Sequence, residues 1–163
     1  MNALILYYSR TGITKKAAEA IKEELGCECE QIFDTKDRSG ALGYLGAGKD
    51  ATTKALTELK PILRDPGKYD LLIIGTPVWA FTMATPIRTY IFEHHTKFKD
   101  VAFFCTLGNS GDSGTFKDMQ NLSHKNPLAK LTLTSKEVND ARHIDRIKEF
   151  CNAVKTEYGK RSI

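Results

Sequence analysis

The sequence predicts an α/β fold in which a parallel sheet of five strands is covered by helices on both faces. Short, continuous apolar runs alternate along the chain with segments in which apolar residues recur every three or four positions. The first pattern is typical of buried strands and the second of amphipathic helices. Strands that alternate with helices form parallel sheets, because right-handed crossovers place the helices on the sheet faces. Five such strands commonly take the order 2-1-3-4-5, with the ligand crevice at the carboxyl ends of the first and third strands.

The chain has the length and composition of one globular domain. Its 163 residues fit a single domain, at roughly 100 to 200 residues per domain, and we expect that domain to span 1–163. A content of 41% hydrophobic and 27% charged residues is ordinary for a globular protein, which excludes collagen, a coiled coil or a disordered chain. No apolar run has the length of a membrane span, and no export signal is evident. We therefore expect a cytoplasmic protein whose four cysteines are reduced thiols.

The first part of the chain predicts a strand, a tight loop, a helix and a weaker strand. Residues 3–8 form a continuous apolar run that reads as a buried strand. Apolar side chains then recur at fourfold spacing up to Gly26, at Ile13, Ala17, Ile21 and Leu25. This spacing predicts an amphipathic helix that ends at the glycine. Residues 27–33 alternate more weakly and predict the second strand.

The remainder predicts three more strands and two more helices. Residues 71–75 and 101–107 are apolar enough for central strands, and 130–134 predict a short fifth strand. A helix should begin at Thr85-Pro86, since threonine is a good N-cap and proline suits the first helical position. The last helix should carry one apolar stripe, formed by Ile144, Ile147, Cys151, Val154 and Tyr158.

The segment 34–50 is unusual because four glycines surround a few large apolar side chains. It lacks the G-x-G-x-x-G pattern that opens a helix directly after a strand, so we expect no dinucleotide site there. Two interpretations remain open. The segment is a flexible loop, or Leu42, Tyr44 and Leu45 fold over the crevice and screen a ligand or partner.

The loop 9–14 offers groups that suit a phosphate. It contains Ser9, Thr11, Gly12 and Thr14 and leads into the first predicted helix. A helix N-terminus carries about half a positive charge and leaves four N–H groups free to donate, so it can hold a phosphate by hydrogen bonds. The alternative is that Thr11 or Thr14 simply caps the helix. No G-x-x-x-x-G-K-[ST] motif is present, which argues against a triphosphate site.

Two further loops should reach the same edge of the sheet. Residues 75–82 place the only tryptophan, Trp79, beside Phe81 directly after a buried strand, where an indole can stack on a flat ring. Residues 106–115 are rich in hydroxyl, amide and glycine groups that let backbone donors approach a heterocycle. Taken separately, residues 75–82 also fit a lid or a core aromatic, and residues 106–115 also fit a mobile turn. Together, the three loops suit a mononucleotide with a large planar ring.

Two of these segments resemble the flavodoxin family. The run Tyr8-Ser9-Arg10-Thr11-Gly12-Ile13-Thr14 resembles its phosphate-loop signature, and Gly75-Thr76-Pro77-Val78-Trp79-Ala80 resembles the loop after its third strand. The resemblance covers nearly the whole chain, and it implies a flavodoxin-like three-layer sandwich that binds FMN without a covalent link. It also implies three groups of cofactor-binding residues: Ser9, Arg10, Thr11, Gly12, Ile13 and Thr14 at the phosphate; Thr76, Pro77, Val78, Trp79, Ala80 and Phe81 along the ring; and Thr106, Leu107, Gly108, Asn109 and Asp112 at its polar edge.

The sequence departs from the family pattern in four respects. Ile13 stands where the family commonly has asparagine, Phe81 occupies a place that is often small, and no glycine lies between Thr76 and Thr85. The net charge is +4, whereas flavodoxins that carry electrons are typically acidic. Acidity disfavours a reduced, anionic flavin, so we expect this protein to have a less reducing couple than its acidic relatives.

Three functions are compatible with these observations. The first is an electron carrier whose partners dock over Trp79, Phe81 and the third loop. The second is an NAD(P)H-dependent quinone or FMN reductase of the same superfamily, and the third is a flavin-free binding module, since a fold alone does not establish a function. The absence of a recognisable NAD(P) phosphate motif favours the carrier, while the basic charge favours the reductase or an unusual partner.

Other kinds of site are not expected. His94 and His95 are adjacent on a predicted helix and do not share a face, so we expect surface histidines and no metal site. The lysines are scattered, so we expect no nucleic-acid partner. The partners we expect are redox proteins or a small quinone or nicotinamide substrate, and the protein is expected to be a monomer or homodimer.

Overall fold

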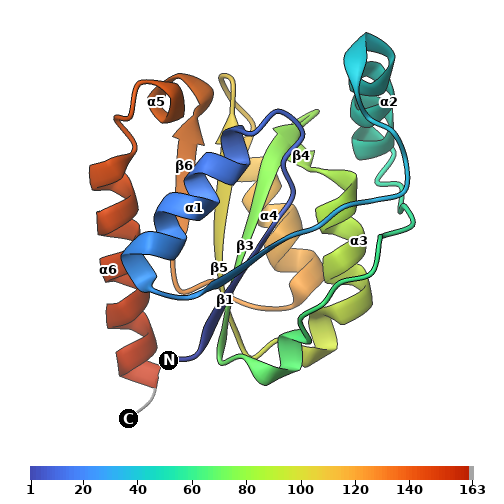
Figure 1. Ribbon diagram of the computed structural model, residues 1–163. Coiled ribbons are helices and arrows are strands. Elements are labelled where there is room, and N and C mark those ends of the chain that lie inside the picture. Colours follow the sequence, from blue (N-terminus) through green and yellow to red (C-terminus); the bar gives the residue numbers. More distant parts are fainter. Residues whose placement is uncertain (162–163) are drawn as a thin grey trace.

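The computed structural model contains one parallel sheet between two layers of helices (Figure 1). It describes residues 1–161, without the side chains of Ala41 and Tyr44. The strands are β1 (Ala3–Tyr7), β2 (Glu28–Gln31), β3 (Leu71–Trp79), β4 (Thr82–Met83), β5 (Asp100–Leu107) and β6 (Lys130–Thr134). The helices are α1 (Ile13–Leu25), α2 (Gly40–Thr52), α3 (Thr85–His94), α4 (Asp112–Ser123), α5 (Ser135–Asn139) and α6 (Ile144–Arg161). Two short 3-10 helices lie at Pro66–Lys68 and His95–Lys97.

The order of the strands confirms the predicted topology. The sheet runs β2-β1-β3-β5-β6, and every pair along this path is parallel. Counted over these five strands, the order is 2-1-3-4-5. The short β4 is an addition that pairs antiparallel with the end of β3. The carboxyl ends of β1, β3 and β5 therefore meet at one edge of the sheet, as the sequence predicts.

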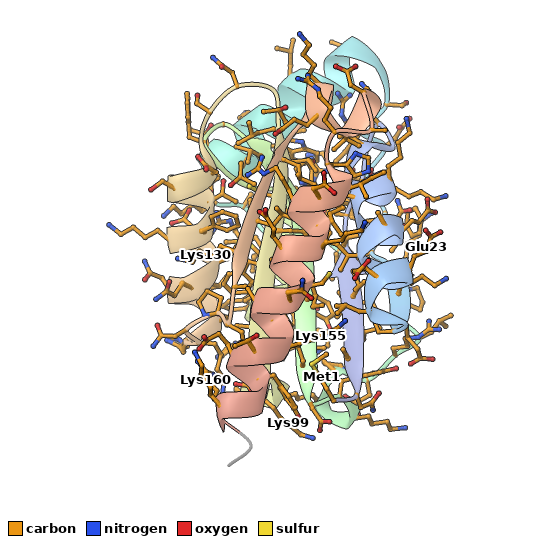
Figure 2. All side chains as sticks on the ribbon, turned by 90° about the vertical axis from the view of Figure 1, so that its left-hand side faces the viewer. Met1, Glu23, Lys99, Lys130, Lys155 and Lys160 are labelled. Carbon is orange, nitrogen blue, oxygen red and sulfur yellow. The ribbon has the colours of Figure 1, made fainter. Side chains whose placement is uncertain are left out.

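The helices cover both faces of the sheet. In Figure 1, α1 and α6 lie on one face and α3 and α4 on the other, while α2 stands beyond α3 at the carboxyl edge. Figure 2 faces α6, which lies beside α1. Among the described residues, no helix has both the length and the apolar character that crossing a membrane requires.

Two apolar clusters, one on each face, hold these layers together. Successive residues of β1 alternate between them: Leu4 and Leu6 pack toward α3 and α4, and Ile5 packs toward α1 and α6. All three side chains are fully buried. Burial of each such side chain contributes about 1.5 to 3 kcal/mol. This two-sided burial explains why the central strands are continuous apolar runs and not alternating ones.

Three local predictions are wrong. The segment 34–50 is not a loop along its whole length, because α2 begins at Gly40 and buries Ala47 and Ala51 in the core. The N-cap of α3 is Ala84 and not Thr85, which lies in the first turn beside Pro86. The polar segment after β5 is shorter than expected, since α4 begins at Asp112.

Candidate functional site

The three predicted loops meet around one cavity of about 180 Å³ at the carboxyl edge of the sheet. We call it the site cavity. Its lining residues are Arg10, Thr11, Ile13, Thr14, Pro77, Val78, Trp79, Thr106, Leu107, Gly108 and Ser135. All of these except Ser135 belong to the set that the flavodoxin resemblance implies. The structure thus brings one segment from each loop to the same place.

The start of α1 leaves backbone donors uncapped. Gly12 occupies the N-cap position with a φ of 90°, a left-handed conformation that glycine adopts without strain. The N–H of Lys16 donates the first helical hydrogen bond to the carbonyl of Gly12, at 3.0 Å. The N–H groups of Ile13, Thr14 and Lys15 precede that bond, and no side chain caps this helix. Such an end is suited to an anion.

Neither threonine of this loop caps the helix, so the alternative interpretation of the loop is wrong. The hydroxyl of Thr14 instead forms a buried hydrogen bond of 2.8 Å with the hydroxyl of Thr106 on β5. The hydroxyl of Ser9 accepts the N–H of Gly12 at 3.1 Å, which closes the loop on itself. The first and third loops are therefore joined directly beneath the cavity.

Trp79 forms the wall between the site cavity and a second cavity. The second cavity, of about 260 Å³, is lined by Leu45, Ala47, Gly48, Lys49, Val78, Trp79 and Ala80. We call it the α2 cavity. The indole packs edge-on against Tyr8, with ring centroids 5.3 Å apart at 85°. The guanidinium of Arg38 lies over the indole, 5.5 Å from its centroid. Only 8% of Trp79 is exposed, so the surface it offers is what borders the two cavities.

Tyr8 is a neutral partner for the indole. Burial, together with the nearby charge of Asp34, raises the pKa of its hydroxyl to about 12, although Arg38 and Arg10 oppose the shift. The phenol therefore stays protonated at physiological pH, and its contact with Trp79 does not change between pH 5 and 9.

The second loop is a β-hairpin with a strained turn. Trp79 pairs with Thr82, so Ala80 and Phe81 are the two turn residues. Their φ values are 47° and 64°, as in the type I′ turns that suit hairpins and usually contain asparagine and glycine. The side chain of Phe81 is 70% exposed. This turn projects an aromatic ring into solvent beside the cavities.

Several contacts fix this hairpin. The hydroxyl of Thr82 donates to Asp118 at 2.6 Å and accepts from Arg88 at 2.7 Å. Burial would raise the pKa of Asp118, but the hydrogen bonds from Thr82 and Arg88 outweigh it and lower the pKa. The start of α4 also packs closely, because a Cβ on Gly111 would lie 2.8 Å from Cγ1 of Val78. The turn is therefore braced by α3 and α4.

The other residues of the predicted set do not line the site cavity. Thr76 is buried and accepts the N–H of Ala84 at 2.9 Å, so it braces the start of α3. Asn109 is exposed, and Asp112 accepts a hydrogen bond of 2.9 Å from Thr132 on β6. Gly12, Ala80 and Phe81 act through the backbone geometry described above. Ser9 lines a third, outer cavity of about 380 Å³, which Arg10 borders as well as the site cavity. The other lining residues of the outer cavity are Tyr8, Phe33, Asp34, Thr35, Lys36, Asp37, Arg38, Ser39 and Lys60.

Sequence reasoning missed Ser135 and Arg38. The hydroxyl of Ser135 donates to the carbonyl of Leu107 at 3.2 Å, which fixes the far wall of the site cavity. Its signal was available, because Thr134 and Glu137 form a capping box that marks the start of α5. Arg38 has no comparable signal, since only the fold brings it to Trp79. Leu42 and Leu45 are 86% and 68% exposed, Leu45 borders the α2 cavity, and neither side chain lines the site cavity. The side chain of Tyr44 lies outside the described part of the chain.

A doubly wound parallel sheet with an uncapped helix start and a tryptophan at its carboxyl edge places this protein in the class of α/β folds whose ligands bind at that edge. Comparison with known families places it within that class. The profile of the family described as Flavodoxin matches residues 2–154. The chain belongs to the flavodoxin family.

Solved structures agree with this assignment. A flavoprotein from Lactobacillus acidophilus, determined in complex with FMN, is 27% identical with a TM-score of 0.71, and the match covers 85% of this chain and 97% of that one. A putative flavoprotein from Bacteroides uniformis is 25% identical with a TM-score of 0.68, over 85% of this chain and 96% of that one. Two-electron reduced flavodoxin from Megasphaera elsdenii, at 16% identity and a TM-score of 0.60, covers 93% and 97% and shows the shared fold. Comparison with curated proteins found no match.

Proposed function

We propose that this protein transfers electrons through non-covalently bound FMN. The observation that carries the proposal is the site cavity itself, in which the uncapped start of α1 and the sole tryptophan border one space. Membership of the flavodoxin family and the FMN bound to the Lactobacillus relative support FMN as the cofactor. FMN supplies the redox chemistry when it is bound, and the protein supplies binding, orientation and electrostatics.

The donors at the site fit a phosphate monoester. The N–H groups of Ile13, Thr14 and Lys15 and the hydroxyl of Thr11 would hold it, with the positive charge of Arg10 nearby. Ile13 contributes its backbone amide, so the absence of the family's asparagine side chain removes one contact and leaves the amide contacts. Oxygen acceptors with negative charge are favoured at such a helix end by both hydrogen bonds and the helix dipole.

The apolar part of the site fits a planar ring. Pro77, Val78, Trp79, Leu107 and Gly108 would border it. The cavity of about 180 Å³ is smaller than the roughly 300 to 1,000 Å³ of pockets that enclose drug-sized ligands. A cofactor held there would keep part of its surface open to solvent, and an exposed redox group is what electron exchange with a partner needs.

We further propose that redox partner proteins dock beside this opening. Phe81 and Leu45 are large apolar side chains that remain 70% and 68% exposed next to Trp79 and Ala80. Exposed apolar residues grouped at one place commonly mark interaction sites. All four cysteines are free thiols, and this supports our proposal that the protein works in the reducing cytoplasm.

The test is an absorption spectrum of the purified protein, before and after addition of NADPH. We expect the spectrum of bound flavin, release of FMN on denaturation, and no rapid bleaching by NADPH unless a separate reductase is added. Rapid bleaching by NADPH alone would contradict the carrier and identify an NAD(P)H-dependent reductase. Failure of the apoprotein to bind added FMN would contradict the whole proposal and leave a flavin-free binding module.

A further inference from the structure

Arg38 is a buried cation that nothing in the proposed function uses. It lies between β2 and α2, and its side chain is only 2% exposed. Burial of an arginine is costly unless the charge is paired and its donors are satisfied. The position of its guanidinium, 5.5 Å from the centroid of Trp79, suggests what it is used for.

Two carboxylates fix the guanidinium in place. Its Nε donates to Asp34 at 2.8 Å, and its Nη1 donates to Asp50 at 3.0 Å. Asp34 also accepts from the hydroxyl of Thr57 at 3.2 Å, and Asp50 accepts from Lys36 at 2.6 Å. Burial would lower the pKa of Arg38, but the hydrogen bonds and charges of both carboxylates raise it, so the group stays charged. Hydrogen bonds to these two carboxylates therefore fix the orientation of the guanidinium plane.

The third nitrogen of the group, Nη2, is buried and has no hydrogen-bond acceptor among the described residues. The guanidinium also lies over the indole of Trp79, with its central carbon 5.5 Å from the ring centroid. A guanidinium over tryptophan gains from the negative face of the ring, and the gain is larger when water is excluded. The burial of both partners provides that condition.

The backbone of Arg38 is also held by α2. A Cβ on Gly43 would lie 2.3 Å from the carbonyl carbon of Arg38, so only glycine permits this approach. Asp50 lies near the other end of the same helix. The backbone of Arg38 therefore packs against the start of α2, and its guanidinium is hydrogen-bonded to Asp50 near the end of that helix. The same guanidinium lies over the indole of Trp79.

We propose that Arg38 is a positioning residue, which holds the indole of Trp79 against the cofactor site and links its orientation to the docking of α2. The part that concerns the cofactor rests on the proposed function. The part that concerns the indole does not, because it is a property of the protein without FMN.

The test uses the fact that Trp79 is the only tryptophan of the chain, so its fluorescence reports this residue alone. Arg38→Lys keeps the charge that pairs with Asp34 but loses the flat face that covers the indole. In the apoprotein we expect a shifted emission maximum and about a twofold rise in quenching by acrylamide, with the far-UV circular dichroism unchanged. We expect FMN affinity to fall by up to about tenfold, because an indole that Arg38 no longer holds must be ordered when FMN binds.

The matched control is Arg64→Lys. Arg64 pairs with Glu28 and Glu30 near the amino end of β2, and its replacement should leave both the emission of Trp79 and FMN affinity unchanged. An Arg38→Lys variant with wild-type emission and quenching would overturn the proposal. A changed emission with unchanged FMN affinity would overturn its cofactor part.

A second variant keeps the test valid if Asp34 cannot tolerate the change. Removing Arg38 alone would leave that carboxylate buried and unpaired, which is strongly destabilising. Arg38→Met combined with Asp34→Asn removes both charges, and we expect the same changes in emission and quenching as in Arg38→Lys. If wild-type protein binds no FMN, the proposed function fails, while the apoprotein fluorescence still decides the role of Arg38.

Discussion

Trp79 is the residue at which packing and function are hardest to separate. Its indole is nearly buried between Tyr8 and Arg38, yet it also borders both cavities at the carboxyl edge. A variant that weakens cofactor binding could therefore act through the fold alone. A test at this residue needs one substitution that removes the ring and another that preserves a ring of similar character.

We expect Trp79→Ala to weaken FMN binding by about 1 kcal/mol or more, because it removes an aromatic wall. Trp79→Phe should lose less than half of that amount. Loss of a buried aromatic also costs about 3 to 5 kcal/mol of stability, so affinities should be compared by titration at a temperature where both variants are folded. Equal FMN affinity in wild type and Trp79→Ala would place the indole outside the cofactor site.

At the scale of elements, the β3–β4 hairpin combines an unfavourable turn with firm support. Ala80 and Phe81 both have positive φ, which costs about 1 to 2 kcal/mol for each residue with a side chain. Arg88 and Asp118 hold Thr82 from below, and α4 packs against the turn through Gly111 and Gly114. The surrounding structure thus maintains a turn that the sequence alone would not favour.

Replacement of the turn by its preferred residues should therefore stabilise the protein. For Ala80→Asn combined with Phe81→Gly we expect the free energy of unfolding to rise by about 1 kcal/mol, since asparagine and glycine adopt type I′ geometry readily. Urea denaturation would measure this change. A loss of stability would indicate that packing of the Phe81 ring stabilises the protein by more than the positive φ of this residue destabilises it.

The start of α5 predicts a dependence of stability on pH. Glu137 accepts hydrogen bonds from the backbone N–H and hydroxyl of Thr134 and pairs with Arg146, and these contacts lower its pKa from 4.5 to about 2. A carboxyl with a depressed pKa stabilises the fold above its unfolded value and loses that contribution as the pH falls through the folded one.

Glu137→Gln should therefore be less stable than wild type at pH 7, by about 1 kcal/mol as for other helix caps. The difference should shrink between pH 4.5 and about 2. Denaturation of both proteins across this range would measure it. A difference independent of pH would show that the ionised carboxylate is not what stabilises this cap.

The sequence predicts well the elements whose apolar residues follow a regular pattern of burial. The runs at β1, β3 and β5 are apolar on both faces, and α1 has a clear apolar stripe. By contrast, α2 contains four glycines and no marked stripe, and its helix forms because Ala47, Ala51 and the ion pairs of Arg38 anchor it. Such tertiary contacts override local propensity. The loops that line the site cavity directly follow β1, β3 and β5, so the sequence could place them at one edge of the sheet. Arg38 meets Trp79 only in the fold, so the sequence could not predict that contact.

At the scale of the whole molecule, the positive charge is widely distributed. The net charge is +4, and Figure 2 labels Lys155 and Lys160 on α6 and Lys99 and Lys130 on other parts of the surface. At physiological salt the Debye length is about 8 Å, so exposed lysines far from the cofactor have little effect on it. The groups that matter line the outer cavity beside the phosphate loop, where the four cations Arg10, Lys36, Arg38 and Lys60 lie against three carboxylates, those of Asp34, Asp37 and Asp50.

This local excess of positive charge predicts the redox behaviour of the bound flavin. Reduction adds negative charge to the cofactor, which nearby cations stabilise, so the potential should be less negative than that of acidic flavodoxins. Salt screens this attraction, and the potential should therefore fall as ionic strength rises, opposite to the trend for an acidic site.

Lys60→Glu should lower the potential and reverse the salt trend. Lys155→Glu on α6 makes the same change in net charge and should leave both almost unaltered. Redox titration with indicator dyes at low and high salt would measure these effects. Equal shifts in the two variants would mean that net charge, and not the cations beside the phosphate loop, sets the potential.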